Sequence, residues 1–248
     1  MKYKYNKERS VGYSESDKNL RISLVGAMNL AQDMMTEYFH SYGCDNYDTK
    51  NNCNAAWVVT KAKAKFYKYP NWIDSSIKCE SYTTVTKGVR ICLETVITDI
   101  NNNILFIVVH ESCPIDLETR KVRKISSVYY PDDMEVEEAK LKEPFNRLKE
   151  NFDNVEFIYN QKVQPTDIDF SNHTNNVKYV KYIMNAFESD FWNDKIITDF
   201  EIHYISESRE NDIISVYKSQ IEEGIINIIL KIEEKEIVKA QIIYKKQN

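Results

Sequence analysis

Glycine and proline are scarce in this chain of 248 residues, which contains five of each. A collagen-like repeat and a flexible low-complexity linker would both need many more, so the sequence excludes them. It also excludes a glycine-rich phosphate-binding loop. The longest apolar runs, Ile104 to Val109 and Ile225 to Leu230, are short enough for strands, whereas a membrane-spanning helix needs roughly 18 residues.

Disulfide and zinc motifs are also missing. The cysteines number five, an odd count, and no two of them form a C-x-x-C pair. This pattern favours reduced thiols over a disulfide framework or a zinc site. The charged N-terminus lacks the apolar stretch of a signal peptide. Together these features predict a cytoplasmic protein without a bound metal.

Neither sign of charge dominates the sequence. The 33 Lys and Arg residues against 38 Asp and Glu residues give a net charge of −5. A general nucleic-acid binder would present a basic domain or stripe, so that class is disfavoured. The hydrophobic share of 42% and the charged share of 29% are typical of a soluble globular protein.

The first half of the chain predicts one helix followed by several strands. Residues 23–43 carry apolar residues at spacings of three and four, with Ser23 as N-cap and Gly43 as the stop. Strands are expected at 57–69, 75–86, 90–100 and 104–116, with a turn at Asn101 to Asn103. In the first of these strands Lys61, Lys63 and Lys65 alternate with smaller residues, which predicts a solvated lysine face.

The second half repeats this plan. A strand at 156–164, a polar loop, a helix at 175–187 and further strands are expected. An ungapped offset of 138 places Thr60 over Thr198, Phe66 over Tyr204 and Asp74 over Asp212. The intervening residues 131–155 are acidic and turn-prone, so we interpret them as a linker with a short helix around 144–152. The pattern predicts a tandem α+β architecture in which a sheet wraps a helix twice.

One polar loop before the second helix concentrates groups that could perform catalysis. An acid, a hydroxyl and an imidazole follow one another at Asp169, Ser171 and His173. A helix start offers unpaired N–H groups that can stabilise an oxyanion. The same residue types are also what a helix N-terminus prefers, so the composition alone slightly favours a capping cluster.

A second candidate group is Glu207, followed by Ser208, inside a strand-like segment over 200–217. The offset puts Tyr69 and Pro70 at the equivalent positions, so only the second half has this acid. An exposed glutamate at a strand end is the structural alternative. The chain has no G-x-S-x-G motif, which disfavours an ordinary serine hydrolase.

These motifs together resemble the acyl-ACP thioesterases of plants and bacteria. The resemblance covers nearly the whole chain. It rests on the stretches WVVTKAKAKFYKYPNWIDSSIKCES, CPIDLETRKVRKI, DIDFSNHTNNVKYVKYIMNAFES and FEIHYISESRENDIISVY. It implies an α+β double hotdog fold, with an acyl-binding domain at 1–130, a linker at 131–155 and a catalytic domain at 156–248. The implied reaction is hydrolysis of a fatty acyl thioester on acyl carrier protein (ACP), which ends chain elongation.

Site residues carried over from the resemblance are Asp169, His173 and Glu207, while the family's catalytic asparagine falls on Ser171. The cysteine that follows the glutamate in plant members falls on Ser208, which agrees with attack by water. We expect Glu207 to act as the base, with a pKa raised by an apolar surrounding. The N–H groups at Thr174, Asn175 and Asn176 are the expected oxyanion donors. No cofactor is expected, because ACP itself brings the phosphopantetheine arm.

Partners and alternatives follow from the same resemblance. ACP is acidic, so we expect it to dock on basic residues, and the densest cluster is Arg120, Lys121, Arg123 and Lys124. A solvated basic face is an equally good interpretation of this cluster. The serine at 171 motivates one alternative, an acyl-ACP-binding module with weakened catalysis. A hotdog dehydratase is a weaker alternative, and a homodimer is one option for the assembly.

Overall fold

The computed structural model describes residues 4–73, 76–131, 136–148 and 155–247. They divide into two compact units, Met1–Glu143 and Pro144–Asn248. The change from one unit to the other falls within the predicted linker. Each unit contains helices and an antiparallel sheet, so the predicted α+β class is confirmed.

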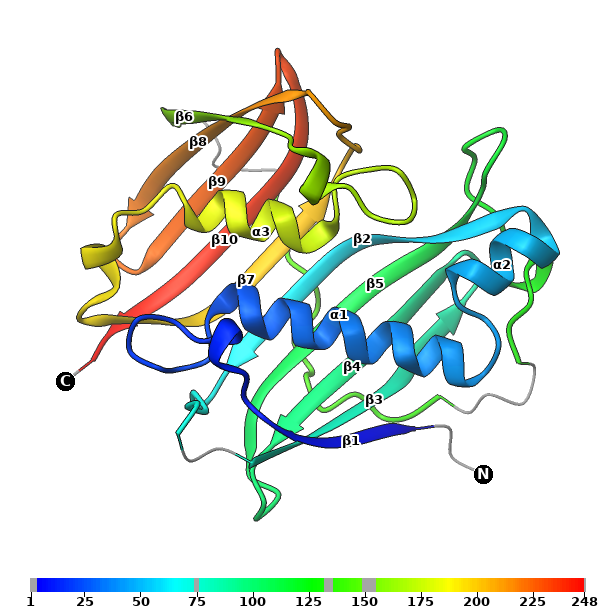
Figure 1. The fold of residues 1–248 in the computed structure, drawn as a ribbon, viewed down its shortest axis with the longest axis horizontal. Coiled ribbons are helices and arrows are strands. Elements are labelled where there is room, and N and C mark those ends of the chain that lie inside the picture. Colours follow the sequence, from blue (N-terminus) through cyan, green and yellow to red (C-terminus); the bar gives the residue numbers. More distant parts are fainter. Residues whose placement is uncertain (1–3, 74–75, 132–135, 149–154, 248) are drawn as a thin grey trace. The chain divides into compact units, whose positions relative to one another are not determined.

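The first unit pairs its strands in an order different from that of the chain. Its elements are β1 (Tyr5–Ser10), α1 (Leu24–Ser41), α2 (Asn46–Cys53), β2 (Ala55–Phe66), β3 (Ser76–Lys87), β4 (Arg90–Thr98) and β5 (Ile104–Asp116), with short 3-10 turns at Tyr13–Glu15 and Ile125–Ser127. The strands lie side by side as β1-β3-β4-β5-β2, all antiparallel. Helix α1 lies across one face of this sheet (Figure 1).

Helix α1 is the helix predicted over 23–43. The Ser23 hydroxyl accepts the N–H of Gly26 at 2.9 Å, which satisfies one of the unpaired donors at the helix start. Gly43 follows the helix with a φ of +65°, a conformation that glycine adopts without a steric penalty. The face predicted to be apolar is buried at Leu24, Met28, Ala31, Met35 and Tyr38, whereas Tyr42 is only partly buried.

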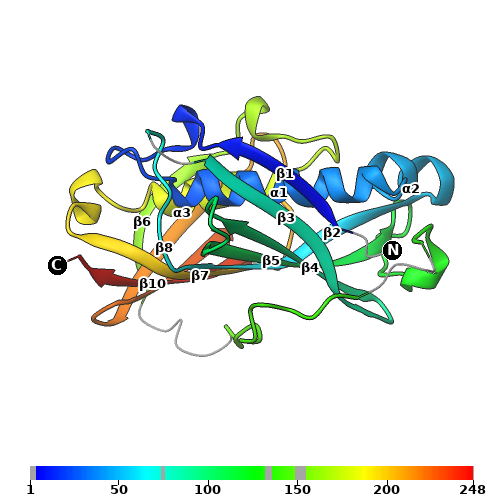
Figure 2. The same ribbon diagram turned by 90° about the horizontal axis from the view of Figure 1, so that it is seen from below.

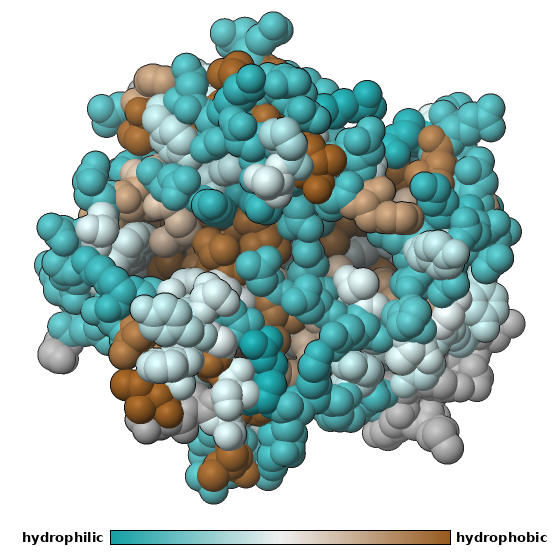
Figure 3. Space-filling model, viewed as in Figure 1, coloured by the Kyte–Doolittle hydropathy of each residue, from teal (hydrophilic) through white to brown (hydrophobic). Residues whose placement is uncertain are grey.

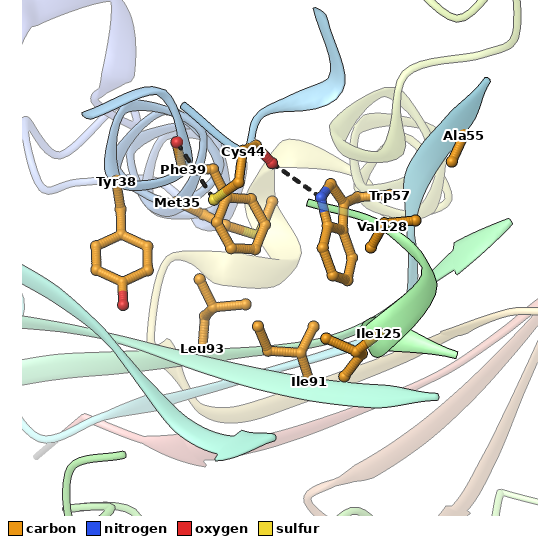
Figure 4. Close-up of a cluster of buried hydrophobic side chains, with 10 residues drawn as sticks. All are labelled: Met35, Tyr38, Phe39, Cys44, Ala55, Trp57, Ile91, Leu93, Ile125 and Val128. Carbon is orange, nitrogen blue, oxygen red and sulfur yellow. Dashed lines mark hydrogen bonds between the residues drawn. The ribbon is translucent and has the colours of Figure 1, made fainter. Parts of the chain in front are cut away.

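A core cluster joins this helix to the sheet, as Figure 4 shows. The rings of Phe39 and Trp57 stack with their centroids 5.3 Å apart. The indole N–H of Trp57 donates to the carbonyl of Cys44 at 2.9 Å, so this buried polar group is satisfied. Ile91 and Leu93 point from β4 toward the helix and close the cluster.

The lysine-bearing strand differs from its prediction. Lys61 pairs with Glu111 at 3.1 Å, and Lys65 pairs with Glu143. Lys63 is buried rather than solvated. Alternation along a strand assigns the face correctly, but it cannot show that other chain segments cover that face.

The second unit repeats the topology of the first. Its elements are β6 (Glu156–Lys162), α3 (Asn176–Met184), β7 (Lys195–Tyr204), β8 (Ile213–Glu222), β9 (Ile225–Ile232) and β10 (Lys235–Lys246), with 3-10 turns at Pro165–Asp167 and Ser189–Trp192. The strands lie in the order β6-β8-β9-β10-β7, the same permutation as in the first unit. The offset of 138 places β7 on residues 57–66, so β2 and β7 end at equivalent positions. The predicted equivalence of Asp74 and Asp212 is not tested, because Asp74 lies outside the described residues.

Two predicted elements need correction, and two observed elements were not predicted. The segment 200–217 is two strands, β7 and β8, and Glu207 lies in their connection. Asn211, which also lies in this connection, has a left-handed φ of 73°, a conformation that does not occur in a regular strand. Helix α3 ends at Met184, and Phe187 lies beyond it among Phe191 and Trp192. Strand β1 and helix α2 were not predicted, because neither carries a clear apolar period.

The described part of the linker, residues 136–148, is docked rather than loose. The buried Glu94 carboxylate accepts the N–H groups of Lys140 and Leu141 at 2.8 and 2.6 Å. The side chain of Leu141 packs with Tyr82, Val96 and Ile107 of the first sheet. Figure 2 shows the green linker segment running along the side of that sheet away from α1. In the second unit, Glu201 accepts the N–H of Asn146 at 2.8 Å. The predicted helix is absent over 144–148, and its residues 149–152 lie outside the described part.

Hydrophilic side chains dominate the face seen in Figure 3, with hydrophobic ones scattered among them. This distribution agrees with sheets whose apolar residues pack under a helix. Among the described residues, no helix combines the length and the apolar character needed to cross a membrane.

Candidate active site

The site is built on the segment that leads into α3, and Asp167 anchors this segment. Its carboxylate accepts the N–H of Gln164 at 2.9 Å and the hydroxyl of Tyr182 at 2.7 Å, and Lys178 lies 3.5 Å away. Burial by itself would raise the pKa of Asp167, but these hydrogen bonds and the nearby ammonium group outweigh it and lower the pKa. An ionised carboxylate therefore fixes the base of the loop.

A closed turn carries Asp169, Ser171 and His173. The N–H of Asp169 donates to the carbonyl of His173 at 2.9 Å, and Asn172 adopts a left-handed φ of 63° at the bend. The Asp169 carboxylate accepts the N–H of Ser171 at 2.8 Å. Asp169 therefore stabilises the turn, and the turn positions His173 just before the start of α3.

His173 meets the second candidate group directly. Its Nε2 lies 3.0 Å from Oε2 of Glu207, although the two residues are 34 positions apart in the chain. The side chain of His173 is 15% exposed and that of Glu207 is 38% exposed. The imidazole is thus largely shielded, while the carboxylate remains accessible to water.

A cluster of hydroxyl groups joins the two segments beside this pair. The Ser208 hydroxyl lies 2.7 Å from Oγ1 of Thr174 and 2.8 Å from the hydroxyl of Tyr179. The N–H of Ser208 donates to the Tyr179 oxygen at 3.0 Å, and the N–H of Thr174 donates to the Ser208 carbonyl at 2.9 Å. Thr174, which follows His173, is therefore hydrogen-bonded to Ser208, which follows Glu207. These bonds hold the two segments together next to the His173–Glu207 pair.

The start of α3 has fewer free donors than the sequence suggests. The N–H of Thr174 is bonded to Ser208, and the N–H of Asn175 donates to the carbonyl of Asp167 at 2.9 Å. The side chain of Asn175 caps the helix by accepting the N–H of Val177. Of the three expected donors, only the N–H of Asn176 makes no hydrogen bond within the described part of the chain.

The basic cluster lies in the first unit, after the end of β5. Arg120, Lys121 and Lys124 are exposed. Arg123 is instead part of the internal structure, because its guanidinium donates to the carbonyls of Cys53 and Ser127. The cluster is therefore a surface of three residues rather than four.

Cysteine and metal chemistry find little support among the described groups. All five cysteines are free thiols, and burial raises the pKa of Cys44 and of Cys79 to about 12, which opposes thiolate formation. One group of side chains, His40, Asp45 and Asp48, brings ligand atoms within 4.8 Å of one another. Asp45 already caps α2 and bonds His40 at 2.7 Å, which explains this arrangement without an ion.

Comparison with known families identifies both halves of the chain. The model of the acyl-ACP thioesterase N-terminal domain matches residues 2–131, and that of the C-terminal domain matches residues 150–246. The chain belongs to the acyl-ACP thioesterase family. No curated protein matches the chain by sequence.

Solved structures agree with this family assignment. An acyl-ACP thioesterase from Bacteroides thetaiotaomicron is similar with a TM-score of 0.86 at 16% identity, over 98% of each chain. The 12:0-ACP thioesterase from Umbellularia californica has a TM-score of 0.83 at 16% identity, over 100% of this chain and 99% of the other. At such identities the likeness establishes the fold.

Sequence reasoning missed two residues of the site. Asp167 and Tyr179 lie within the stretch DIDFSNHTNNVKYVKYIMNAFES, but the sequence does not single them out as site residues. Capping by an acid three residues after Gln164 could have identified Asp167. The role of Tyr179 had no such signal, because its partner Ser208 is 29 residues away.

Proposed function

We propose that this protein hydrolyses fatty acyl-ACP to a free fatty acid and ACP, which ends acyl-chain elongation. The observation that carries the proposal is the pair formed by His173 and Glu207 at the start of α3. The family assignment supports the substrate class. The repeated strand order supports a double hotdog, with the acyl chain held by residues 1–130 and the reaction performed by residues 156–248.

In the first step, water attacks the carbonyl carbon of the thioester and Glu207 takes its proton. One carboxylate oxygen, Oε2, accepts the Nε2–H of His173, and the carboxylate, whose side chain is 38% exposed, accepts the proton from water. The C=O bond becomes a single bond to a negatively charged oxygen. The N–H of Asn176, at the positive end of the α3 dipole, stabilises that charge.

In the second step the tetrahedral intermediate collapses. The C=O bond re-forms, the C–S bond breaks, and the departing sulfur takes the proton from Glu207. The products are the fatty acid and the thiol of the phosphopantetheine arm, and no resident cofactor takes part. Asp169 contributes by holding the turn, since its carboxylate accepts the N–H of Ser171. The proposed role of the Ser171 hydroxyl is donation to the water.

The test is release of fatty acid and free thiol from acyl-ACPs of graded chain length. Glu207→Gln and His173→Ala should each lower turnover about a hundred-fold or more, since each removes a group that handles the proton. Glu210→Gln is the matched control, because Glu210 is an exposed acid in the same connection. Circular dichroism should show the same fold in all variants.

Wild-type turnover in both variants would overturn the assignment. Binding of acyl-ACP without hydrolysis by the wild-type protein would instead favour the binding-module alternative. In that case Ser171→Asn, which restores the family's asparagine, should produce turnover if the serine is the cause.

A further inference from the structure

Two neighbouring side chains on β5 are buried, and each has a polar atom with no hydrogen-bond partner in the part of the chain that the structure describes. His110 and Ser112 lie on β5 and are 4% and 1% exposed. Within the described residues, Nδ1 of His110 and Oγ of Ser112 have no hydrogen-bond partner. Buried polar groups are rarely left unpaired, because they lose their bonds to water without replacement.

Both side chains lie on the helix side of the sheet. His110 is directly opposite Leu93, and Ser112 is directly opposite Ile91. Cross-strand neighbours share a face, and these two partners pack with Phe39 of α1 (Figure 4). The unpaired atoms are therefore in the layer between α1 and the sheet, not on the outer face.

Other polar groups in this layer satisfy one another. Ser81 and Thr95 bond at 2.7 Å, and the hydroxyls of Tyr38 and Tyr130 both bond Thr83, at 3.1 and 2.9 Å. His110 and Ser112 are exceptions that are neighbours on one face of one strand. On β2 the residue opposite His110 is Ala62, whose small side chain leaves the imidazole without a polar or bulky neighbour there.

The chemistry of the two groups suits an uncharged oxygen. Burial lowers the pKa of His110 to about 4, so the imidazole is neutral near pH 7 and offers one donor and one acceptor. A hydroxyl such as that of Ser112 can also donate and accept. A hydroxyl or keto oxygen fits both groups, whereas a plain methylene chain leaves them unpaired.

We propose that His110 and Ser112 form a recognition site for an oxygen atom on the acyl chain, so that the protein prefers hydroxylated or keto acyl chains to unsubstituted ones. This inference rests on the proposed function, because it requires the first unit to hold the acyl chain. Ordered water at the two groups is the competing occupant.

The test measures binding of free fatty acids by calorimetry. The probes are hexadecanoic acid and its hydroxy derivatives with the hydroxyl near the carboxylate, in mid-chain or at the methyl end. We expect one hydroxy acid to bind about ten-fold more tightly than hexadecanoic acid. Ser112→Ala and His110→Phe should each reduce this preference, and Thr95→Val, which alters a paired hydroxyl in the same layer, should preserve it.

Equal affinity for all probes would overturn the inference and leave water as the occupant. The inference would also be overturned if the variants lost as much affinity for hexadecanoic acid as for the hydroxy acids. Ser112→Ala removes one atom, so it tests the site even if His110→Phe does not fold. Hydrolysis separates the two proposals. Turnover of plain and hydroxylated acyl-ACP at the same kcat/KM overturns only the oxygen site, whereas selective binding without any turnover overturns only the thioesterase.

Discussion

At the scale of single residues, the site depends on two side chains that the chain keeps far apart in sequence. His173 follows a closed turn, and Glu207 lies in a connection between strands. The bonds among Thr174, Tyr179 and Ser208 join the two segments beside the pair, whose atoms lie 3.0 Å apart. We therefore expect these buried hydroxyl groups to position His173 and Glu207.

Tyr179→Phe tests this role. It keeps the ring and removes the oxygen that bonds both the N–H and the hydroxyl of Ser208. We expect kcat to fall about ten-fold with KM nearly unchanged, because the base is displaced while the acyl chain still binds. Steady-state kinetics with acyl-ACP, together with the pH–rate profile, provide the measurement.

Tyr159→Phe is the matched control for that variant. Tyr159, on β6, donates to the carbonyl of Tyr182, so Tyr159→Phe also removes a partly buried hydrogen bond. The hydrogen bonds of the Ser208 hydroxyl are made with Thr174 and Tyr179 instead. The kcat of Tyr159→Phe should stay at the wild-type value. Equal effects of the two variants on kcat would show that Tyr179 matters only for stability.

At the scale of elements, the start of α3 combines a cap with a buried acid. Asn175 caps the helix, and Asp167 binds the segment before it to Tyr182 within the helix. The sequence predicted this helix start because capping is local. It placed the helix end too late, because Phe187 fits the helical period yet packs in an aromatic group beyond the helix.

Asp167 should make the stability of the second unit depend on pH. Its pKa is lowered in the folded state, so its contribution is present above the ordinary carboxyl pKa of about 3.9 and is lost as the pH falls through the folded value. Asp167→Asn should reduce the free energy of unfolding by about 1–3 kcal/mol at pH 7. Urea denaturation at pH 7 and pH 3 measures this difference.

The difference between Asp167→Asn and the wild type should be smaller at pH 3. That pH lies below the ordinary carboxyl pKa of about 3.9, so the unfolded state already takes up the proton and part of the contribution of Asp167 is lost. Asp190→Asn, an exposed position, is the control and should change stability little at either pH. A loss that is the same at both pH values would assign the effect to packing instead of charge.

At the scale of the whole molecule, the proposed reaction needs a surface for an acidic carrier protein. Arg120, Lys121 and Lys124 are exposed beyond the end of β5, whereas Arg123 holds backbone carbonyls. Reversing the first three to Glu should raise KM for acyl-ACP about ten-fold and leave a small acyl thioester unaffected. The effect should diminish at high salt, because exposed charges are screened.

Lys68→Glu is the control for this surface. The N–H of Lys68 donates to Leu105 at the opposite end of β5, so its charge lies away from the cluster. It should leave KM for acyl-ACP unchanged. Equal increases for acyl-ACP and the small thioester in the triple variant would exclude docking at Arg120, Lys121 and Lys124.

Local sequence patterns predict the α+β class, two of the helices, most strands and the repeat, because apolar period, capping and turn residues act over a few positions. The sequence also singled out Asp169, His173 and Glu207 as candidates. The tertiary contacts show that Glu207 lies in a connection beside His173 and that Lys63 is buried. They also show that, of the three expected donors, the N–H of Asn176 is the one without a hydrogen bond in the described part of the chain. Each of these depends on contacts between distant segments, which local patterns do not encode.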